Sequence, residues 1–230
     1  MINESMTSRN FTSKQDEPSN ELDQPLVLVV DDDKSVREAV EELMLSAGMK
    51  CACFASTQEL LQTDMLKHPG CLVLDVRMPG SSGLDLQRHL AATGIPKPIV
   101  FLTGYGDIPM TVDAMKAGAI DFLTKPVRGQ ALLDAVTAGI NRDATDRAKA
   151  IAITRNVERL GKLTPRERQI IREVACGRLN KQIAFDLGIS EVTVKLHRSH
   201  AMQKLEASSI GELVRIWESL PVSTREAGAT

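Results

Sequence analysis

The sequence predicts a doubly wound α/β domain, built on a five-stranded parallel sheet, followed by a small all-α domain. From about residue 25 to residue 141, five short apolar runs alternate with stretches whose apolar residues recur at helical spacing, a pattern typical of parallel strands joined by helices. After residue 160 no strand pattern returns, and helix-start signals follow one another. The strand runs are continuously apolar because strands of such a sheet are buried on both faces.

The elements of the first domain follow from this alternation. The opening run, LVLVV, predicts a buried strand, and the next helix carries Val36, Val40 and Leu43 on one face before Gly48 provides a left-handed cap. Four further pairs of strand and helix repeat the arrangement. We expect strands near residues 26–30, 49–54, 71–75, 98–102 and 120–123, and helices near 34–46, 56–66, 83–92, 108–117 and 128–141.

A helical linker and a second domain are expected after the sheet. Residues 142–160 contain no proline or glycine and predict a linker helix. The second domain, residues 161–220, opens with Thr164 as N-cap, Pro165 in the first turn and Glu167 to complete a capping box. Its four helices are expected to start near Thr164, Asn180, Ser190, and Ser208 or Ser209.

Composition favours a soluble, cytoplasmic protein. The chain has 230 residues, 43% of them hydrophobic, and a net charge of -2, which suits one or two globular domains. Residues 1–24 are polar without hydrophobic periodicity, so we expect a disordered tail and neither a signal peptide nor a membrane span. Residues 221–230 are also expected to be an unstructured tail. The four cysteines show no metal-binding spacing and are interpreted as reduced packing residues.

Polar side chains follow four of the apolar runs: Asp31 and Asp32, then Asp75, Thr103 and Lys125. The carboxyl ends of the strands meet at the ligand-binding crevice of a doubly wound fold, so we expect these groups to converge. Clustered carboxylates stay ionised together when a hard cation such as Mg2+ binds between them. The hydroxyl and the ammonium suit phosphoryl oxygens, and Asp75 is the expected nucleophile of an aspartyl-phosphate.

The same segments resemble the receiver domain of bacterial two-component response regulators, a flavodoxin-like fold with a CheY-like strand order. The resemblance covers about residues 25–141. It rests on VVDDD at 29–33, LDVRMPGSSGLD at 74–85, LTGYGD at 102–107 and DFLTKP at 121–126. It implies Mg2+ as the cofactor and a sensor histidine kinase as the phosphate donor.

The resemblance also implies a role for each residue of the cluster. Asp75 accepts the phosphoryl group, and Lys125 pairs with it. Thr103 and Phe122 match a switch pair, in which the hydroxyl moves to a phosphoryl oxygen and the aromatic ring rotates into the vacated space. The peptide bond to Pro126 is expected to be cis. The implied metal ligands are the carboxylates of Asp31, Asp32 and Asp75 and the carbonyl of Arg77.

The second domain resembles the LuxR or NarL type of helix-turn-helix. The resemblance rests on LTPRERQII, GRLNKQIAFDLGIS and EVTVKLHRSHAMQKL within residues 160–219. Local pattern agrees, because Ile183, Ala184 and Leu187 face one side of a short helix and Gly188 permits the turn. A receiver joined to this domain resembles the FixJ and NarL group. Promoter DNA with paired half-sites, a homodimer formed on phosphorylation, and RNA polymerase are the implied partners.

The second helix of this motif carries the expected DNA contacts. Lys195 is expected to donate to guanine or phosphate, and Leu196 to contact a thymine methyl group. Ser199 departs from the long basic or amide side chain often found at its position in the family. Residues 160–220 carry ten Lys and Arg against seven Asp and Glu, a mildly basic balance. The expected phosphate contacts are Lys181, Thr193, Arg198, His200 and Lys204.

Two other functions compete with a phosphorylation-dependent regulator. A phosphohydrolase of the haloacid dehalogenase type also uses carboxylates and Mg2+, but it needs a second aspartate two residues after the nucleophile as a general acid. Arg77 stands there, so we do not expect an enzyme that turns over external substrates. The remaining alternative is a binding module with an inert receiver, against which the intact Asp75, Thr103 and Lys125 argue.

Overall fold

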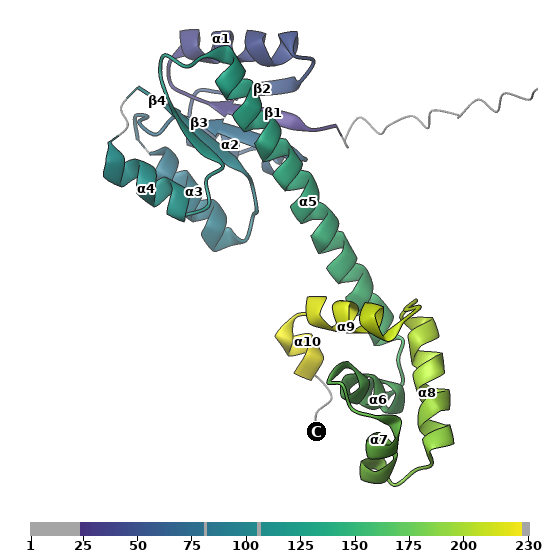
Figure 1. Ribbon diagram of the computed structural model, residues 1–230. Coiled ribbons are helices and arrows are strands. Elements are labelled where there is room, and N and C mark those ends of the chain that lie inside the picture. The colour runs from purple at the N-terminus through teal and green to yellow at the C-terminus, as the bar shows by residue number, and fades with distance from the viewer. Residues whose placement is uncertain (1–23, 81, 105–106, 227–230) are drawn as a thin grey trace, which may run out of the picture. The chain divides into compact units, whose positions relative to one another are not determined.

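The computed structural model describes residues 24–80, 82–104 and 107–226, and the chain divides into two compact units, Met1–Ala144 and Thr145–Thr230 (Figure 1). The predicted disordered tail, residues 1–24, lies outside the described residues except for Gln24. Among the helices that the structure describes, none combines the length and the hydropathy needed to span a bilayer.

The first unit is built on the predicted five-stranded parallel sheet, whose order is β2-β1-β3-β4-β5. From β1 the chain goes outward to β2 and then returns to β3 on the other side of β1. The sheet therefore has its topological switch point between β1 and β3, where doubly wound folds bind ligands. The strands are β1 (Leu26–Val30), β2 (Lys50–Phe54), β3 (Gly70–Leu74), β4 (Ile99–Thr103) and β5 (Asp121–Thr124).

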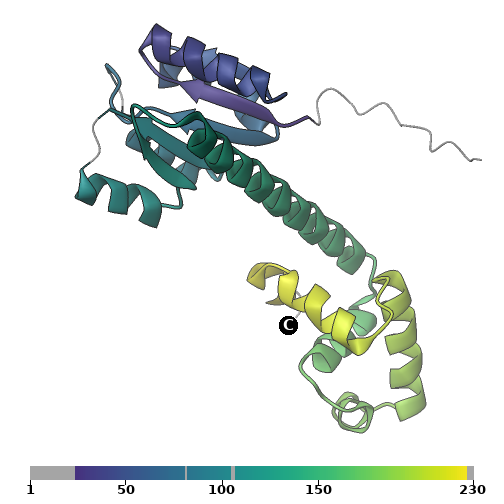
Figure 2. The same cartoon turned by 45° about the horizontal axis from the view of Figure 1, so that its top comes forward.

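Helices cover both faces of this sheet (Figures 1 and 2). Alternate residues of β1 belong to different cores: Leu28 packs in the core that includes α2, α3 and α4, and Val29 packs in the core that includes α1 and α5. The fold class predicted from the sequence is thus confirmed. The helices are α1 (Lys34–Ser46), α2 (Thr57–Leu61), the short 3-10 helix η2 (Met65–Lys67), α3 (Gly83–Thr93), α4 (Ile108–Lys116) and α5 (Gly129–Gly161).

Two helix predictions differ from the structure. The helix expected at 56–66 ends at Leu61, because the Thr63 side chain accepts from the Met65 amide and starts a separate short turn. The helix expected at 128–141 and the linker expected at 142–160 form one continuous helix, α5. With no proline or helix-ending glycine between them, neither sequence segment has a reason to stop.

Buried charges fix the base of the sheet, at the amino ends of the strands. The carboxylate of Asp143, on α5, is buried and accepts from the Gly70 amide at 2.9 Å. The ammonium of Lys97, also buried, donates to the carbonyl of His68 at 2.7 Å. The hydrogen bond from Gly70 places Asp143 against the sheet, so α5 stays anchored there up to the boundary of the first unit.

The second unit is all-α, with Ile170, Ile183, Val194 and Leu213 in one apolar core. The capping box that Thr164 forms at the start of α6 is confirmed. The predicted unstructured tail at 221–230 instead contains a helix, α10, whose first turn closes through amides that donate to the Pro221 carbonyl. The helices are α6 (Pro165–Ala175), α7 (Asn180–Leu187), α8 (Glu191–Lys204), α9 (Ile210–Ser219) and α10 (Val222–Glu226).

Close packing of α5 on β3 generates a first prediction. A methyl group at Gly139 would lie 2.5 Å from the Cys71 sulfur, whereas one at Gly161, in the same helix, would meet nothing within 4 Å. Gly139→Ala should therefore lower the free energy of unfolding of the first unit by about 1–3 kcal/mol, although alanine favours helix by about 1 kcal/mol. Urea denaturation followed by circular dichroism measures this.

The control for that experiment is Gly161→Ala, which should leave stability unchanged or raised. Gly139→Ala should also cost less in a Cys71→Ala background, because the clashing sulfur is gone. Equal stability of Gly139→Ala and the unmodified chain would contradict the packing argument.

Candidate functional site

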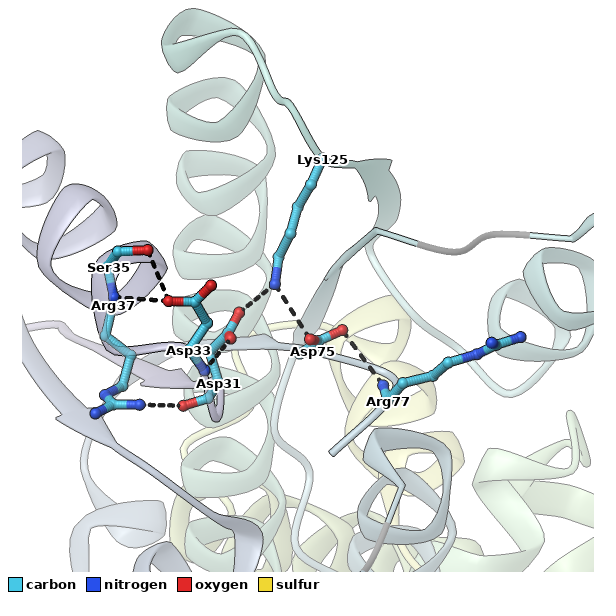
Figure 3. Close-up of polar contacts among 7 residues, drawn as sticks. All are labelled: Asp31, Asp33, Ser35, Arg37, Asp75, Arg77 and Lys125. Carbon is cyan, nitrogen blue, oxygen red and sulfur yellow. Dashed lines mark hydrogen bonds and ion pairs between the residues drawn. The ribbon is translucent and has the colours of Figure 1, made fainter. Parts of the chain in front are cut away.

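The first candidate site lies where β1 and β3 end side by side. Val30 and Leu74 are register partners, and the amide of Asp75 donates to the Val30 carbonyl at 2.9 Å. This pairing places the carboxylates of Asp31 and Asp75 next to each other. The Lys125 ammonium reaches both, at 2.5 Å from Asp31 Oδ2 and 3.1 Å from Asp75 Oδ2 (Figure 3). Three of the predicted residues, from three strand ends, therefore meet.

Backbone groups hold the remaining carboxylate oxygens in place. Asp31 Oδ1 accepts from the Asp33 amide at 3.0 Å, and Asp75 Oδ1 accepts from the Arg77 amide at 3.3 Å (Figure 3). The Arg37 guanidinium donates to the Asp31 carbonyl at 2.6 Å, which ties the first turn of α1 to the end of β1. Side chains fixed in this way need little rearrangement when they react or bind a cation.

Burial and charge act against each other in the cluster. Asp31 is 2% exposed and Asp75 7%. Burial raises the pKa of Asp31, and the neighbouring charge of Asp75 adds to this effect, which the Lys125 and Asp33 hydrogen bonds only partly offset. Burial lowers the pKa of Lys125, but the hydrogen bonds and charges of both aspartates outweigh it and raise the pKa overall. Lys125 is therefore a stable cation.

The donor set fits a hard divalent cation. Asp31, Asp32 and Asp75 each offer a carboxylate oxygen, and these oxygens lie within 4.8 Å of one another. Asp32 is exposed, so one side of the cluster opens to water, as suits Mg2+, which usually keeps several water ligands. Oxygen donors crowded in this way form the acidic pocket typical of a Mg2+ site.

The predicted switch residues lie beside this pocket. Thr103 is buried at the end of β4, and its carbonyl accepts from the Lys125 amide at 2.8 Å. Phe122, half-buried on β5, packs its ring against Phe101 with centroids 5.8 Å apart. The peptide bond between Lys125 and Pro126 is cis, as expected.

The second candidate site is the helix-turn-helix of α7 and α8. Gly188 joins the two helices in a left-handed conformation at φ 62°, and the buried Val194 and Ala201 fix the inner face of α8. Several predicted DNA-contacting side chains are exposed. They are Lys181 on α7 and Lys195, Leu196, Ser199 and His200 on α8.

Three other predicted contacts already have partners within the unit. The Thr193 hydroxyl lies 2.8 Å from that of Ser190, and the half-buried Arg198 donates to Asn180 at 3.2 Å. Lys204 forms an ion pair with Glu167 at 2.7 Å. These side chains hold the motif together, which the one-dimensional pattern did not indicate.

Sequence reasoning missed Val192. This valine is the second residue of α8 and is exposed. It precedes Leu196 by four residues, so both stand on one helical face. That spacing was the available signal, but a single valine in a helix is more often a core residue.

The fold and the two sites together define a receiver domain joined to a helix-turn-helix unit, the architecture of a two-component response regulator. Residues 27–137 match the response regulator receiver domain, and residues 161–217 match the bacterial regulatory proteins of the luxR family. The chain belongs to the response regulators that combine these two domains. It is a transcriptional regulator and not a classical enzyme.

Individual relatives match along most of the chain. Nodulation protein W of Bradyrhizobium diazoefficiens is 46% identical and covers 89% of this chain and 90% of its own. Transcriptional regulatory protein FixJ of Azorhizobium caulinodans is 42% identical over 83% of this chain and 90% of its own. The low-resolution structure of the response regulator StyR aligns with a TM-score of 0.72 at 48% identity, covering 85% of this chain and 98% of that one.

The ion pair of Glu167 generates a prediction about pH. Burial raises the pKa of Glu167, but hydrogen bonds from Lys204 and Thr164 outweigh it and hold the pKa below its ordinary value of 4.5. The charged carboxylate therefore stabilises the fold above about pH 4.5, and this contribution is lost as the pH falls through the lower folded-state pKa. Glu167→Gln should lower the free energy of unfolding of the second unit by about 1–2 kcal/mol at pH 7.

Thermal and urea unfolding at pH values between 7 and 3 test this expectation. The difference between Glu167→Gln and the unmodified chain should shrink as the pH falls below about 4.5. Glu218→Gln, at an exposed position of α9, should show little difference at any pH. A Glu167→Gln difference that stays constant over this pH range would contradict the assignment.

Proposed function

We propose that a sensor histidine kinase phosphorylates Asp75, that the phosphorylated receiver dimerises, and that the dimer binds paired half-sites in promoter DNA. The observation that carries this proposal is the position of the Lys125 ammonium between the carboxylates of Asp31 and Asp75. A nucleophile with a cation beside it suits attack on an anionic phosphoryl group. The helix-turn-helix in the same chain supports DNA as the output.

The transfer step uses groups already in place. An oxygen of the Asp75 carboxylate attacks the phosphorus of a phosphohistidine, an O–P bond forms, the N–P bond breaks, and the imidazole leaves with the electron pair. Lys125 then pairs with a phosphoryl oxygen. Asp31, Asp32, Asp75 and the carbonyl of Arg77 would hold Mg2+, which when bound would compensate the charge on the phosphoryl oxygens. Arg77 itself is no general acid, which favours a switch over a phosphohydrolase.

The phosphoryl group adds charge and acceptor oxygens beside Thr103. The Thr103 hydroxyl moves to one of these oxygens, and the Phe122 ring rotates into the space that it leaves. Because Phe122 is only half-buried, its ring lies at the border of the core and the surface. The change therefore reaches the surface formed by residues 108–140.

An exposed apolar stripe on α4 supports dimerisation through this surface. Ile108 is 80% exposed, Val112 41% and Met115 42%, and their spacing of four and three residues places them on one face. Three large apolar side chains gathered on one exposed helix face indicate an interface. In the unphosphorylated state we expect weak DNA binding, because each chain then presents a single helix-turn-helix.

The DNA contacts divide into two classes. Lys195 and Leu196, in the N-terminal half of α8, face the base edges, and Ser199 follows one turn later on the same side of the helix with a shorter side chain than the family usually has. The phosphate contacts, which set the position of the protein on the duplex, are Lys181, Thr193, Arg198, His200 and Lys204. RNA polymerase is a further candidate partner of a promoter-bound regulator.

Phosphotransfer tests the input. The unmodified chain should be labelled by phosphoramidate in the presence of Mg2+, Asp75→Asn should not be labelled, and Lys125→Ala should be labelled more slowly because the cation is lost. Phosphate-affinity gel electrophoresis measures all three. Asp134→Asn, which changes an exposed aspartate on α5, is the control and should be labelled normally. Labelling of Asp75→Asn at the unmodified rate would disprove the assignment of the phosphoacceptor.

Sedimentation tests the α4 stripe. Beryllofluoride, a mimic of the phosphoryl group, should convert the unmodified chain from monomer to dimer. Ile108→Asp should raise the dimer dissociation constant at least about ten-fold, because it buries a charge in an apolar interface. Leu45→Asp, at an exposed apolar residue of α1, should dimerise normally. If Ile108→Asp dimerised as well as the unmodified chain, the interface would lie elsewhere.

A further inference from the structure

We infer that Val192 and Leu196 form an apolar reading surface for thymine methyl groups, so that each half-site contains two thymines within about two base steps. The inference rests on the DNA binding proposed above and adds a specificity-determining residue, Val192, and a base preference. Val192 is 75% exposed and Leu196 is 53% exposed. They are one helical turn apart on the outer face of α8.

The fold does not require apolar side chains at these two positions. Val194 and Ala201 provide the inner face of α8, and both are completely buried in the core of the unit. Val192 and Leu196 do not belong to that core. A large apolar side chain that stays exposed keeps its burial energy available for a partner.

The side chains around the two residues indicate that this partner is DNA. Lys195 lies between them in the sequence and is exposed, and His200 is exposed one turn after Leu196. A face that combines apolar side chains with an exposed lysine complements a groove bordered by phosphates. It is a poor match for an apolar protein surface, which would have to desolvate the lysine.

Thymine is the base that this surface recognises. Of the four bases, thymine alone presents an apolar group, its 5-methyl, in the major groove. Cytosine and adenine present amino donors there, which Val192 and Leu196 cannot satisfy, so an apolar contact disfavours them. One turn of helix is about 5.4 Å and one base step about 3.4 Å, which sets the spacing of one to two steps.

Replacement of thymine by deoxyuridine tests the inference, because it removes the methyl group and nothing else. Duplexes are first selected from a random-sequence library with the full-length chain in its beryllofluoride form. Each thymine of a selected half-site is then replaced singly, and affinity is measured by fluorescence anisotropy. The affinity of the unmodified chain should fall about four-fold on replacement at each of two neighbouring positions, as expected for the loss of one buried methyl group.

Variants assign each methyl group to a side chain. At one of the two positions, Val192→Ala should have the same affinity for the duplex with thymine as for the duplex with deoxyuridine. At the other position, Leu196→Ala should have the same affinity for both duplexes. Both residues are exposed, so neither change should alter the thermal midpoint. Val222→Ala makes the same substitution at an exposed residue of α10, and this variant should lose affinity on deoxyuridine replacement at both positions as the unmodified chain does.

The outcomes separate this inference from the proposed function. If selected duplexes bind tightly but no deoxyuridine replacement changes affinity, the thymine reading is wrong and DNA binding stands. If Val192→Ala loses as much affinity as the unmodified chain on deoxyuridine replacement at both positions, the role inferred for Val192 is wrong. If the library yields no enriched sequence, sequence-specific binding itself fails, and the inference fails with it.

Discussion

The receiver site depends on one electrostatic constraint: two buried carboxylates stand side by side and require a cation. Asp31 and Asp75 are adjacent because β1 and β3 pair in register, so the sheet order itself brings their charges together. Lys125 offsets them from a third strand end, at 2.5 and 3.1 Å. The Lys125 amide donates to the Thr103 carbonyl, which fixes the backbone position from which the side chain reaches the two carboxylates. Partial compensation of the charge of the site is thus built into the arrangement of β1, β3, β4 and β5, and the remaining negative charge suits a divalent cation.

This constraint explains why the site suits a switch. In the proposed switch, a phosphoryl group on Asp75 replaces a single negative charge by a charge of about -1.5 to -2, and Lys125 must then balance a different set of oxygens. Lys125 is joined to Thr103 by its backbone, and Phe122 lies on the strand that ends at Lys125. The backbone of Lys125 therefore joins the ends of β4 and β5 beside the site. In the proposed switch the covalent change is local, and the hydrogen-bonded strand ends are the route by which it reaches the surface.

The parts that sequence predicted share a local cause, and the parts it missed depend on distant contacts. Strand ends and capping residues such as Thr164 were predicted because run length, alternation and side-chain type act within a few residues. The Asp143 to Gly70 hydrogen bond and the Glu167 to Lys204 ion pair join residues 73 and 37 positions apart, which no local pattern encodes. The outward position of Val192 was missed for the same reason, since only the packed core shows which face of α8 remains exposed to solvent.

Internal pairing also limits how tightly one DNA-binding unit can hold DNA. Arg178 pairs with Glu173 and Asp186, and Lys204 with Glu167, so these cations stabilise the helical unit before any phosphate is present. A phosphate that recruits them must compete with a carboxylate, which reduces the gain in affinity. Two linked units offset such a reduction through effective concentration. In the proposed function, receiver dimerisation is therefore an efficient point of control, because it supplies the second linked unit.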